Sequence, residues 1–178
     1  MKGGSILTFD GIIPEIEEEV FLAPGCYVIG QVKLHKGVSV WYNSVLRADN
    51  KTWITVGEDT NIQDNCVVHM NRQTSSTKIG CFTSIGHSCV LHGCTIEDYC
   101  LIGMNATIMD NAVIGEGSII GAGAVVSPGI IIPPYSVVVG VPGKVVKSLD
   151  QQTIREARIN QAQHYKYLAQ KHMQMLML

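Results

Sequence analysis

The 178-residue sequence has few aromatic residues, little net charge and no long apolar run. Aromatic residues make up 6% of the chain while glycine occurs 18 times, a composition typical of short strands joined by tight turns. The formal net charge of −2 argues against a nucleic-acid-binding or membrane-surface protein. No segment approaches the roughly 18 apolar residues of a membrane span, and the N-terminal MKGGSILTFDG lacks the apolar core of a signal peptide. We therefore expect a soluble, cytoplasmic protein.

The six cysteines include no CxxC motif of the kind that marks a zinc or redox site. Five of them share one phase of the repeat described next, a phase that is otherwise filled by Ala, Ser, Thr and Val: Cys26, Cys66, Cys89, Cys94 and Cys100. Because a free cysteine packs as a small hydrophobe, these five are predicted to be core residues. Cys81 lies off that phase and receives no role.

Aliphatic residues recur at every sixth position along most of the chain. From residue 96 onward they are Ile96, Ile102, Ile108, Ile114, Ile120, Val126 and Ile132. The same phase occurs earlier at Val28, Leu34, Val40 and Leu46, then at Val56, Ile62 and Val68, and then at Ile79, Ile85 and Leu91. A small residue lies two positions before most of them. This period predicts a parallel β-helix, in which three hexapeptides form one triangular coil and the aliphatic residue faces the axis.

Two interruptions of the repeat predict loops on the outside of the β-helix. The gap from Leu46 to Val56 is ten residues, which places a loop around DNKTW, and the gap from Val68 to Ile79 is eleven, which places another around NRQTSST. The spacing from Leu91 to Ile96 is five residues, one less than the period of six.

The C-terminal segment follows a different period. Ser148 and Gln151 form a capping-box pattern, and apolar or neutral residues then recur at helical spacing. These residues are Ile154, Ala157, Gln161, Tyr165, Leu168 and His172. The pattern predicts a helix over about 150–174, so the chain divides into an all-β domain, 1–148, and a C-terminal helix and tail, 149–178, packed on it.

Counting in coils aligns several polar residues into two columns. When the extra loop residues are subtracted, Arg47, His69 and His92 occupy equivalent positions of successive coils. Tyr42, Asp64 and His87 do the same on the preceding side of the triangle. Coils stack about 4.8 Å apart, so both histidines of the first column can reach one ion.

Because His87 lies on a different side, one chain is not expected to gather all three histidines. A threefold trimer that packs the second column of one subunit against the first column of its neighbour would gather them. The alternative is that each histidine is an ordinary surface residue, as we expect for His35, His164 and His172. The nearby charged residues Arg47, Asp49 and Asp64 favour the metal-site interpretation of His69, His87 and His92.

Five short segments resemble the γ-class carbonic anhydrase family. They are LRAD (46–49), NIQD (61–64), VVH (67–69), IGH (85–87) and LHGC (91–94), and the resemblance extends over roughly residues 11–145. The hexapeptide repeat alone is shared with many acyltransferases, whereas this ordered set is more specific. The resemblance implies a left-handed β-helix that assembles as a homotrimer with metal sites between subunits.

The resemblance also implies a role for each matching residue. His69 and His92 of one subunit and His87 of the next bind the metal, whose bound hydroxide converts CO₂ reversibly to bicarbonate. Gln63 orients the metal-bound solvent, and Asp64 orients the site. Arg47 and Asp49 form an intersubunit salt bridge near the site. Considered without the family, Arg47, Asp49 and Asp64 also suit plain interface salt bridges.

The chain departs from the family pattern at two places that carry acidic residues in the most active members. Asn50 stands where those members have Glu, and the loop NRQTSST holds no carboxylate to accept a proton. This absence puts fast turnover in doubt. Tyr165 and Tyr167 of the C-terminal helix are candidate substitutes, although ordinary helix packing is the favoured interpretation of both. Three imidazoles suit Zn²⁺ best, with Fe²⁺ or Co²⁺ as alternatives.

Two other functions remain open at this stage. Hexapeptide trimers often bind acyl-CoA between subunits, so an acyltransferase or acyl-CoA thioesterase is one alternative. A non-catalytic metal-binding trimer is the other. No nucleic acid and no membrane is expected as a partner.

Overall fold

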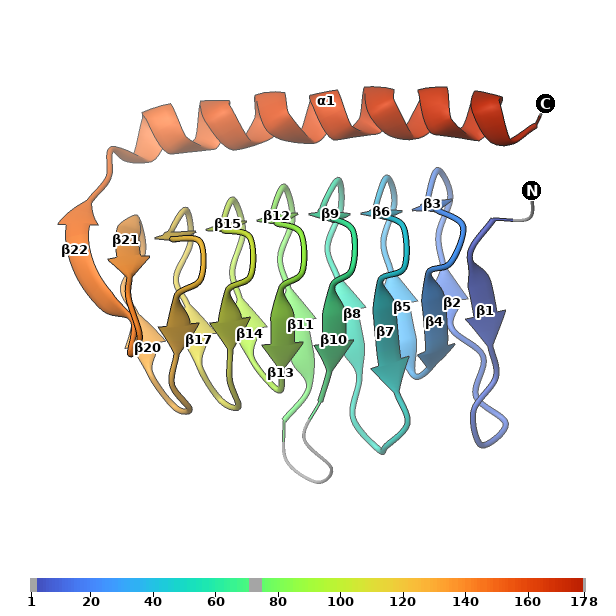
Figure 1. Ribbon diagram of the computed structural model, residues 1–178, viewed down its shortest axis with the longest axis horizontal. Helices are drawn as coiled ribbons and strands as arrows, with labels where there is room; N and C mark the ends of the chain where they lie inside the picture. The colour runs from blue at the N-terminus through green and yellow to red at the C-terminus, as the bar shows by residue number, and fades with distance from the viewer. Residues whose placement is uncertain (1–2, 71–74, 178) are drawn as a thin grey trace.

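The computed structural model describes residues 3–70 and 75–177 as a parallel β-solenoid with one C-terminal helix (Figure 1). The predicted all-β, hexapeptide-repeat fold is confirmed. Each coil contributes one short strand to each of three parallel sheets, and the helix lies along the solenoid. The predicted loop NRQTSST falls partly on residues 71–74, which lie outside the described residues.

Every third strand along the chain joins the same sheet. Sheet 1 contains β1 (Ser5–Leu7), β4 (Tyr27–Gly30), β7 (Val45–Ala48), β10 (Val67–His69), β13 (Val90–His92), β16 (Thr107–Ile108) and β19 (Val125–Val126). Sheet 2 contains β2 (Glu15–Ile16), β5 (Val32–Leu34), β8 (Ile54–Val56), β11 (Thr77–Ile79), β14 (Thr95–Ile96), β17 (Val113–Ile114) and β20 (Ile131–Ile132). Sheet 3 contains β3 (Phe21–Leu22), β6 (Ser39–Val40), β9 (Asn61–Ile62), β12 (Ser84–Ile85), β15 (Leu101–Ile102), β18 (Ile119–Ile120), β21 (Ser136–Val139) and the antiparallel β22 (Lys144–Ser148).

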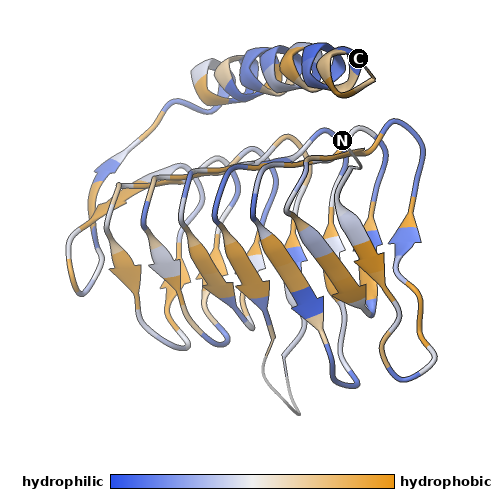
Figure 2. Cartoon of the chain, turned by 45° about the vertical axis from the view of Figure 1, so that its right-hand side comes forward, coloured by the Kyte–Doolittle hydropathy of each residue, from blue (hydrophilic) through white to orange (hydrophobic). Residues whose placement is uncertain are grey.

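The interior of the solenoid is the aliphatic ladder that the repeat predicts. All of the predicted inward aliphatic residues are at most 3% exposed, and the five in-phase cysteines are at most 1% exposed. The cysteines are therefore packing residues, as predicted, and all six are free thiols. Burial raises the pKa of the Cys26, Cys94 and Cys100 thiols to about 12, because a thiolate is poorly solvated there. Figure 2 colours the chain by hydropathy and shows that the strands are mostly hydrophobic and the turns more polar.

The register confirms the counting that produced the two columns. Leu46 pairs with Val68, and Val68 with Leu91, despite the longer sequence gaps between them. The ten-residue gap is taken up by residues 49–53, between β7 and β8. The one-residue slip is also present, since Leu91 pairs with Ile108 at a separation of 17.

The C-terminal helix α1 spans Gln151–Leu176, two residues beyond the predicted end. Its N-cap is Asp150, whose carboxylate accepts a hydrogen bond from Thr153 N, so the predicted capping box at Ser148 is wrong. Ser148 instead ends strand β22, where its backbone pairs with Ser136. The predicted face of the helix is correct: Ile154 is buried, and Tyr165 and Leu168 pack with Phe21 and Trp41.

Among the residues that the structure describes, no helix combines the length and the hydropathy that crossing a lipid bilayer requires.

Candidate metal centre

His69 and His92 end the adjacent strands β10 and β13 and pair directly in the sheet register. Their rings face each other outside sheet 1, with His69 Nδ1 3.2 Å from His92 Nε2. Two nitrogens that bind one tetrahedral Zn²⁺ at about 2.0–2.1 Å lie about 3.3 Å apart. The two imidazoles therefore have the separation that a shared ion requires.

The other nitrogen of each ring bonds to a carboxylate. His69 Nε2 donates to Asp49 Oδ1 at 2.9 Å, and His92 Nδ1 donates to Asp110 Oδ1 at 2.7 Å. A neutral imidazole carries one proton, so a ring that donates through one nitrogen presents a lone pair at the other. Two lone pairs then point at each other across 3.2 Å, an arrangement that a cation between them would stabilise.

Asp49 is held by basic groups on two sides. Arg47 forms an ion pair with it, His69 donates to it, and the Asn50 amide donates at 3.3 Å. Burial alone would raise the pKa of the Asp49 carboxyl, but the bond from His69 and the charge of Arg47 outweigh burial and lower it. Asp49 is therefore a carboxylate at neutral pH.

The second predicted column lies in the turns that precede the strands of sheet 1, at the opposite end of these strands from His69 and His92. His87 occupies the turn between β12 and β13, and its Nδ1 lies 2.7 Å from Asp64 Oδ2. Ser88 takes the left-handed backbone conformation at φ 61°, which makes the sharp corner, and its N–H donates to Asp64 O. Tyr42 stacks beneath Asp64, since Asn65 N donates to Tyr42 O.

One chain does not bring the three histidines together. His87 lies in the turn before strand β13, whereas His92 is the last residue of that strand. Within residues 3–70 and 75–177, no group of three His, Cys, Asp or Glu side chains is placed to hold an ion. The two facing imidazoles are therefore the pair of metal-binding donors that the described part of one chain brings together.

Comparison with known proteins identifies the family of this chain. A "Probable carbonic anhydrase" of Methanocaldococcus jannaschii is 51% identical over 151 residues, covering 85% of this chain and 94% of that protein. "Gamma carbonic anhydrase 1, mitochondrial" of Arabidopsis thaliana is 43% identical over 165 residues, but this chain spans only 59% of its length. The chain belongs to the γ-class carbonic anhydrase family.

Two further comparisons agree with the hexapeptide architecture of this γ-class chain. The family model for bacterial transferase hexapeptide (six repeats) matches residues 76–108 and 93–128. The crystal structure of a hexapeptide transferase family protein from Anaplasma phagocytophilum superposes with a TM-score of 0.86 at 37% identity, covering 93% of this chain and 96% of that one.

Gln63 lies with the His87 column of the γ-class chain rather than with His69 and His92. It follows strand β9, is 6% exposed, and donates through Nε2 to Asn61 Oδ1 at 3.1 Å. Asn61 in turn donates to Ser84 at 2.8 Å, so the amide is held by a buried polar chain. Gln63 therefore lies beside the turn that carries His87.

The C-terminal helix reaches the same column. Tyr165 packs edge-on against Trp41, with ring centroids 5.7 Å apart, and burial followed by the charge of Asp64 raises its pKa. His172 is not the plain surface residue that was predicted, because its Nδ1 lies 2.7 Å from the Tyr42 hydroxyl and its ring contacts Trp41. His164 is exposed, as predicted.

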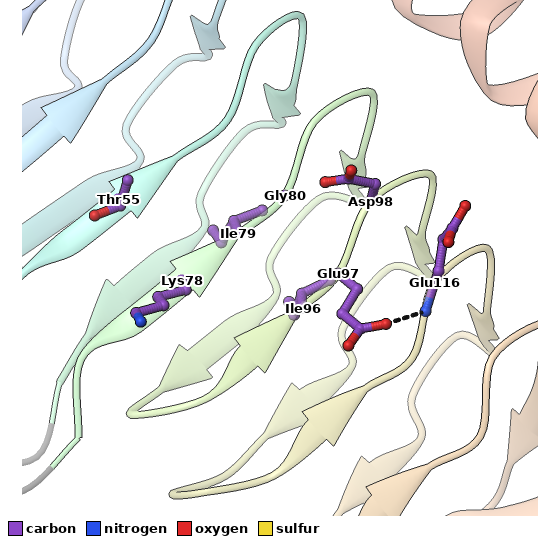
Figure 3. A pocket seen from close by; sticks show the side chains of 8 residues that line it. All are labelled: Thr55, Lys78, Ile79, Gly80, Ile96, Glu97, Asp98 and Glu116. Atoms are coloured by element: carbon purple, nitrogen blue, oxygen red, sulfur yellow. Dashed lines mark hydrogen bonds between the residues drawn. The ribbon is translucent and has the colours of Figure 1, made fainter.

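One pocket on the solenoid lies away from the candidate centre, and another adjoins it. One, of about 430 Å³, lies on sheet 2 and is lined by Thr55, Lys78, Ile79, Gly80, Ile96, Glu97, Asp98 and Glu116 (Figure 3). No predicted site residue lines it. The other, of about 580 Å³, is lined by Phe9, Asp10, Ile12, Gln31, Ala48, Asp49, Asn50 and Lys51, and so it adjoins the candidate centre through Asp49.

Sequence reasoning missed Asp110. The register pairs Leu91 with Ile108, so the equivalent of His92 in the next coil is Met109, and Asp110 lies one position beyond that column. Asp110 lies in the first regular coil beyond those that carry the loops.

Proposed function

We propose that this chain forms a carbonic anhydrase that hydrates CO₂ reversibly to bicarbonate at sites shared between subunits of a homotrimer. His69 and His92 of one subunit and His87 of the next would hold a divalent ion, with Zn²⁺ the first candidate and Fe²⁺ or Co²⁺ the alternatives. The observation that carries the proposal is the pair of facing ring nitrogens 3.2 Å apart, each ring oriented by a carboxylate.

The outer surface of sheet 1 supports the shared site. Its strands place one row of mostly apolar side chains between the two columns, in direct register: Tyr27, Val45, Val67, Val90, Thr107 and Val125. Tyr27, Val67 and Val90 are 42%, 43% and 38% exposed. A row of this kind favours contact with another protein surface, and the His87 side chain, 46% exposed, lies beside it.

Each residue then has a distinct task. A bound ion would supply the Lewis acidity that makes hydroxide available near neutral pH. Asp49 and Asp64 hold the imidazoles of His69 and His87 in one orientation. Arg47, with a side chain 46% exposed, offers a positive charge that attracts the bicarbonate anion. Gln63, held by Asn61, would orient bound solvent or substrate.

The decisive experiment measures CO₂ hydration by stopped-flow on protein loaded with zinc, or with iron under anaerobic conditions. His92→Ala should lower kcat/KM at least about a hundredfold, since it removes one of three ligands. His164→Ala, on the exposed face of the helix, is the matched control and should leave the rate unchanged. Equal rates for wild type and His92→Ala would reject the proposal. Sedimentation of the metal-loaded wild type should give the mass of three chains.

One observation favours a second candidate, an acyl-CoA thioesterase or acyltransferase. The 580 Å³ pocket beside Asp49 is far larger than a three-atom substrate needs, and the Anaplasma neighbour is described as a hexapeptide transferase family protein. Acyl-CoA turnover, assayed with and without a chelator, separates the two. Turnover of thioesters without hydration of CO₂ would favour this candidate.

A further inference from the structure

Asp110 lies in the turn that follows strand β16, one coil beyond His92. Its Oδ1 accepts from His92 Nδ1 at 2.7 Å, and its side chain is 27% exposed. Unlike Asp49, which also pairs with Arg47, Asp110 has His92 as its one ion-pair partner within the described residues. The geometry gives the carboxylate a specific task at this ring.

Backbone hydrogen bonds on both sides fix the position of Asp110. Asn111 N donates to Gly93 O at 2.8 Å, which ties the turn to the residue that follows His92. Gly129 N donates to Asp110 O at 2.8 Å from the next coil. Asn111 adopts φ 59°, a left-handed conformation that asparagine tolerates. The carboxylate therefore belongs to a rigid corner and not to a mobile loop.

We propose that Asp110 is the positioning residue for His92: it holds the imidazole as the Nδ1–H tautomer and aims Nε2 at the ion shared with His69. This inference rests on the proposed metal centre but concerns a residue outside the coils that supply the ligands. Without the carboxylate, the neutral ring can carry its proton on either nitrogen, and the Nε2–H form cannot bind a metal through that atom. Carboxylates that orient a histidine ligand typically change metal affinity 10–100-fold.

The first test reads the tautomer directly, without any metal. Two-bond ¹H–¹⁵N spectra of the metal-free, ¹⁵N-histidine-labelled protein should show His92 as the Nδ1–H form, with the signals assigned by their loss in His92→Ala. In Asp110→Ala the ring should shift to a mixture of tautomers or to Nε2–H. A wild-type ring that is already Nε2–H would overturn the proposal, whether or not the protein hydrates CO₂.

The second test measures zinc affinity by competition with a chelating indicator. Asp110→Ala should bind about 10–100-fold more weakly, and Asp110→Asn, which keeps an acceptor oxygen but loses the charge, should lose less. Asp98→Asn is the matched control, because Asp98 also bonds across adjacent coils, to Cys81 N at 2.8 Å, but touches no histidine. Unchanged affinity in Asp110→Ala would refute the assignment.

These outcomes separate the two proposals. A protein that binds zinc through an oriented His92 but does not hydrate CO₂ would sustain the role of Asp110 and reject the carbonic anhydrase function. If Asp110→Ala fails to fold, Asp110→Asn and the wild-type tautomer still decide the question.

Discussion

Residues 42–93 and residues 94–138 build the same solenoid but differ on its outside. At one outward position of sheet 1, the first region presents Arg47, His69 and His92, and the next coil presents Met109. At the position after the inward aliphatic residue of sheet 3, one coil of the first region has Gln63, whereas the following coils have Gly86, Gly103 and Gly121. The interior does not distinguish the two regions, since Ile85 and Ile108 are equally buried at 0%.

This difference distinguishes the inward residues, which determine the fold, from the outward residues, which form the candidate site. Inward positions are filled by the same kinds of residue in every coil, because every coil must bury one layer of the ladder. Outward positions carry no such requirement, so charged and imidazole groups can be placed there at little cost in stability. The first region therefore carries the three candidate histidines on its outside, and the second region contributes Asp110.

The largest effect, on stability, is expected from truncating an inward aliphatic residue in either region. Ile85→Ala and Ile108→Ala should each lower the free energy of unfolding by about 2–5 kcal/mol, because each leaves a cavity in the ladder. Urea denaturation of the metal-free protein measures both. Met109→Ala, beside Ile108 but 38% exposed, should cost less than about 0.5 kcal/mol. A much smaller loss in one region than in the other would contradict the claim that the interior is uniform.

A smaller effect, on catalysis, is expected from substituting Gln63, which lies at the position that is glycine in the following coils. Gln63→Ala should lower the kcat for CO₂ hydration about tenfold, equivalent to about 1.4 kcal/mol, while metal stoichiometry stays unchanged. The reason is that the amide, held by Asn61, would no longer orient bound solvent or substrate. Val113→Ala, an outward residue of sheet 2 in the regular region, is the control and should leave kcat within twofold. An unaltered kcat in Gln63→Ala would remove this residue from the site.

The period of six predicted the coils, the buried ladder and the column register from sequence alone. The arithmetic succeeded because a solenoid converts sequence separation directly into stacking, so that His69 and His92 had to be neighbours. The outward side-chain contacts were less predictable. Asp110 reaches His92 diagonally from the following coil, and His172 reaches Tyr42 from a helix 130 residues away. Neither contact follows from the repeat.

The helix start was predicted wrongly for a related reason. Ser148 and Gln151 match a capping box, but strand β22 extends through Ser148 and its pairing with β21 competes with helix formation. Asp150 then caps the helix, since its carboxylate satisfies the N–H of Thr153 at 2.9 Å. Local motifs do not reveal a strand pairing of this kind.

Helix α1 connects the two regions, and its contacts differ at its two ends. Near its start, Arg155 pairs with Glu116 of the regular region, and Tyr135 donates to the same carboxylate at 2.7 Å. Farther along, Lys166 pairs with Asp59 at 3.0 Å, and His172 meets Tyr42 in the region that carries the site. The two ends of the helix are therefore held by different contacts.

The smallest effect is expected from Glu116→Gln, which should lower the free energy of unfolding by about 1 kcal/mol at pH 7 because the ion pair is partly exposed. Burial alone would raise the pKa of the Glu116 carboxyl, but hydrogen bonds from Tyr135 and Arg155 outweigh burial and lower it below the ordinary 4.5. A lowered folded-state pKa stabilises the protein above the unfolded value and ceases to do so as pH falls through the folded one. The difference between wild type and Glu116→Gln in urea denaturation should therefore shrink below pH 4.5. A wild-type advantage that persists in acid would mean that Glu116 stabilises the helix through packing rather than charge.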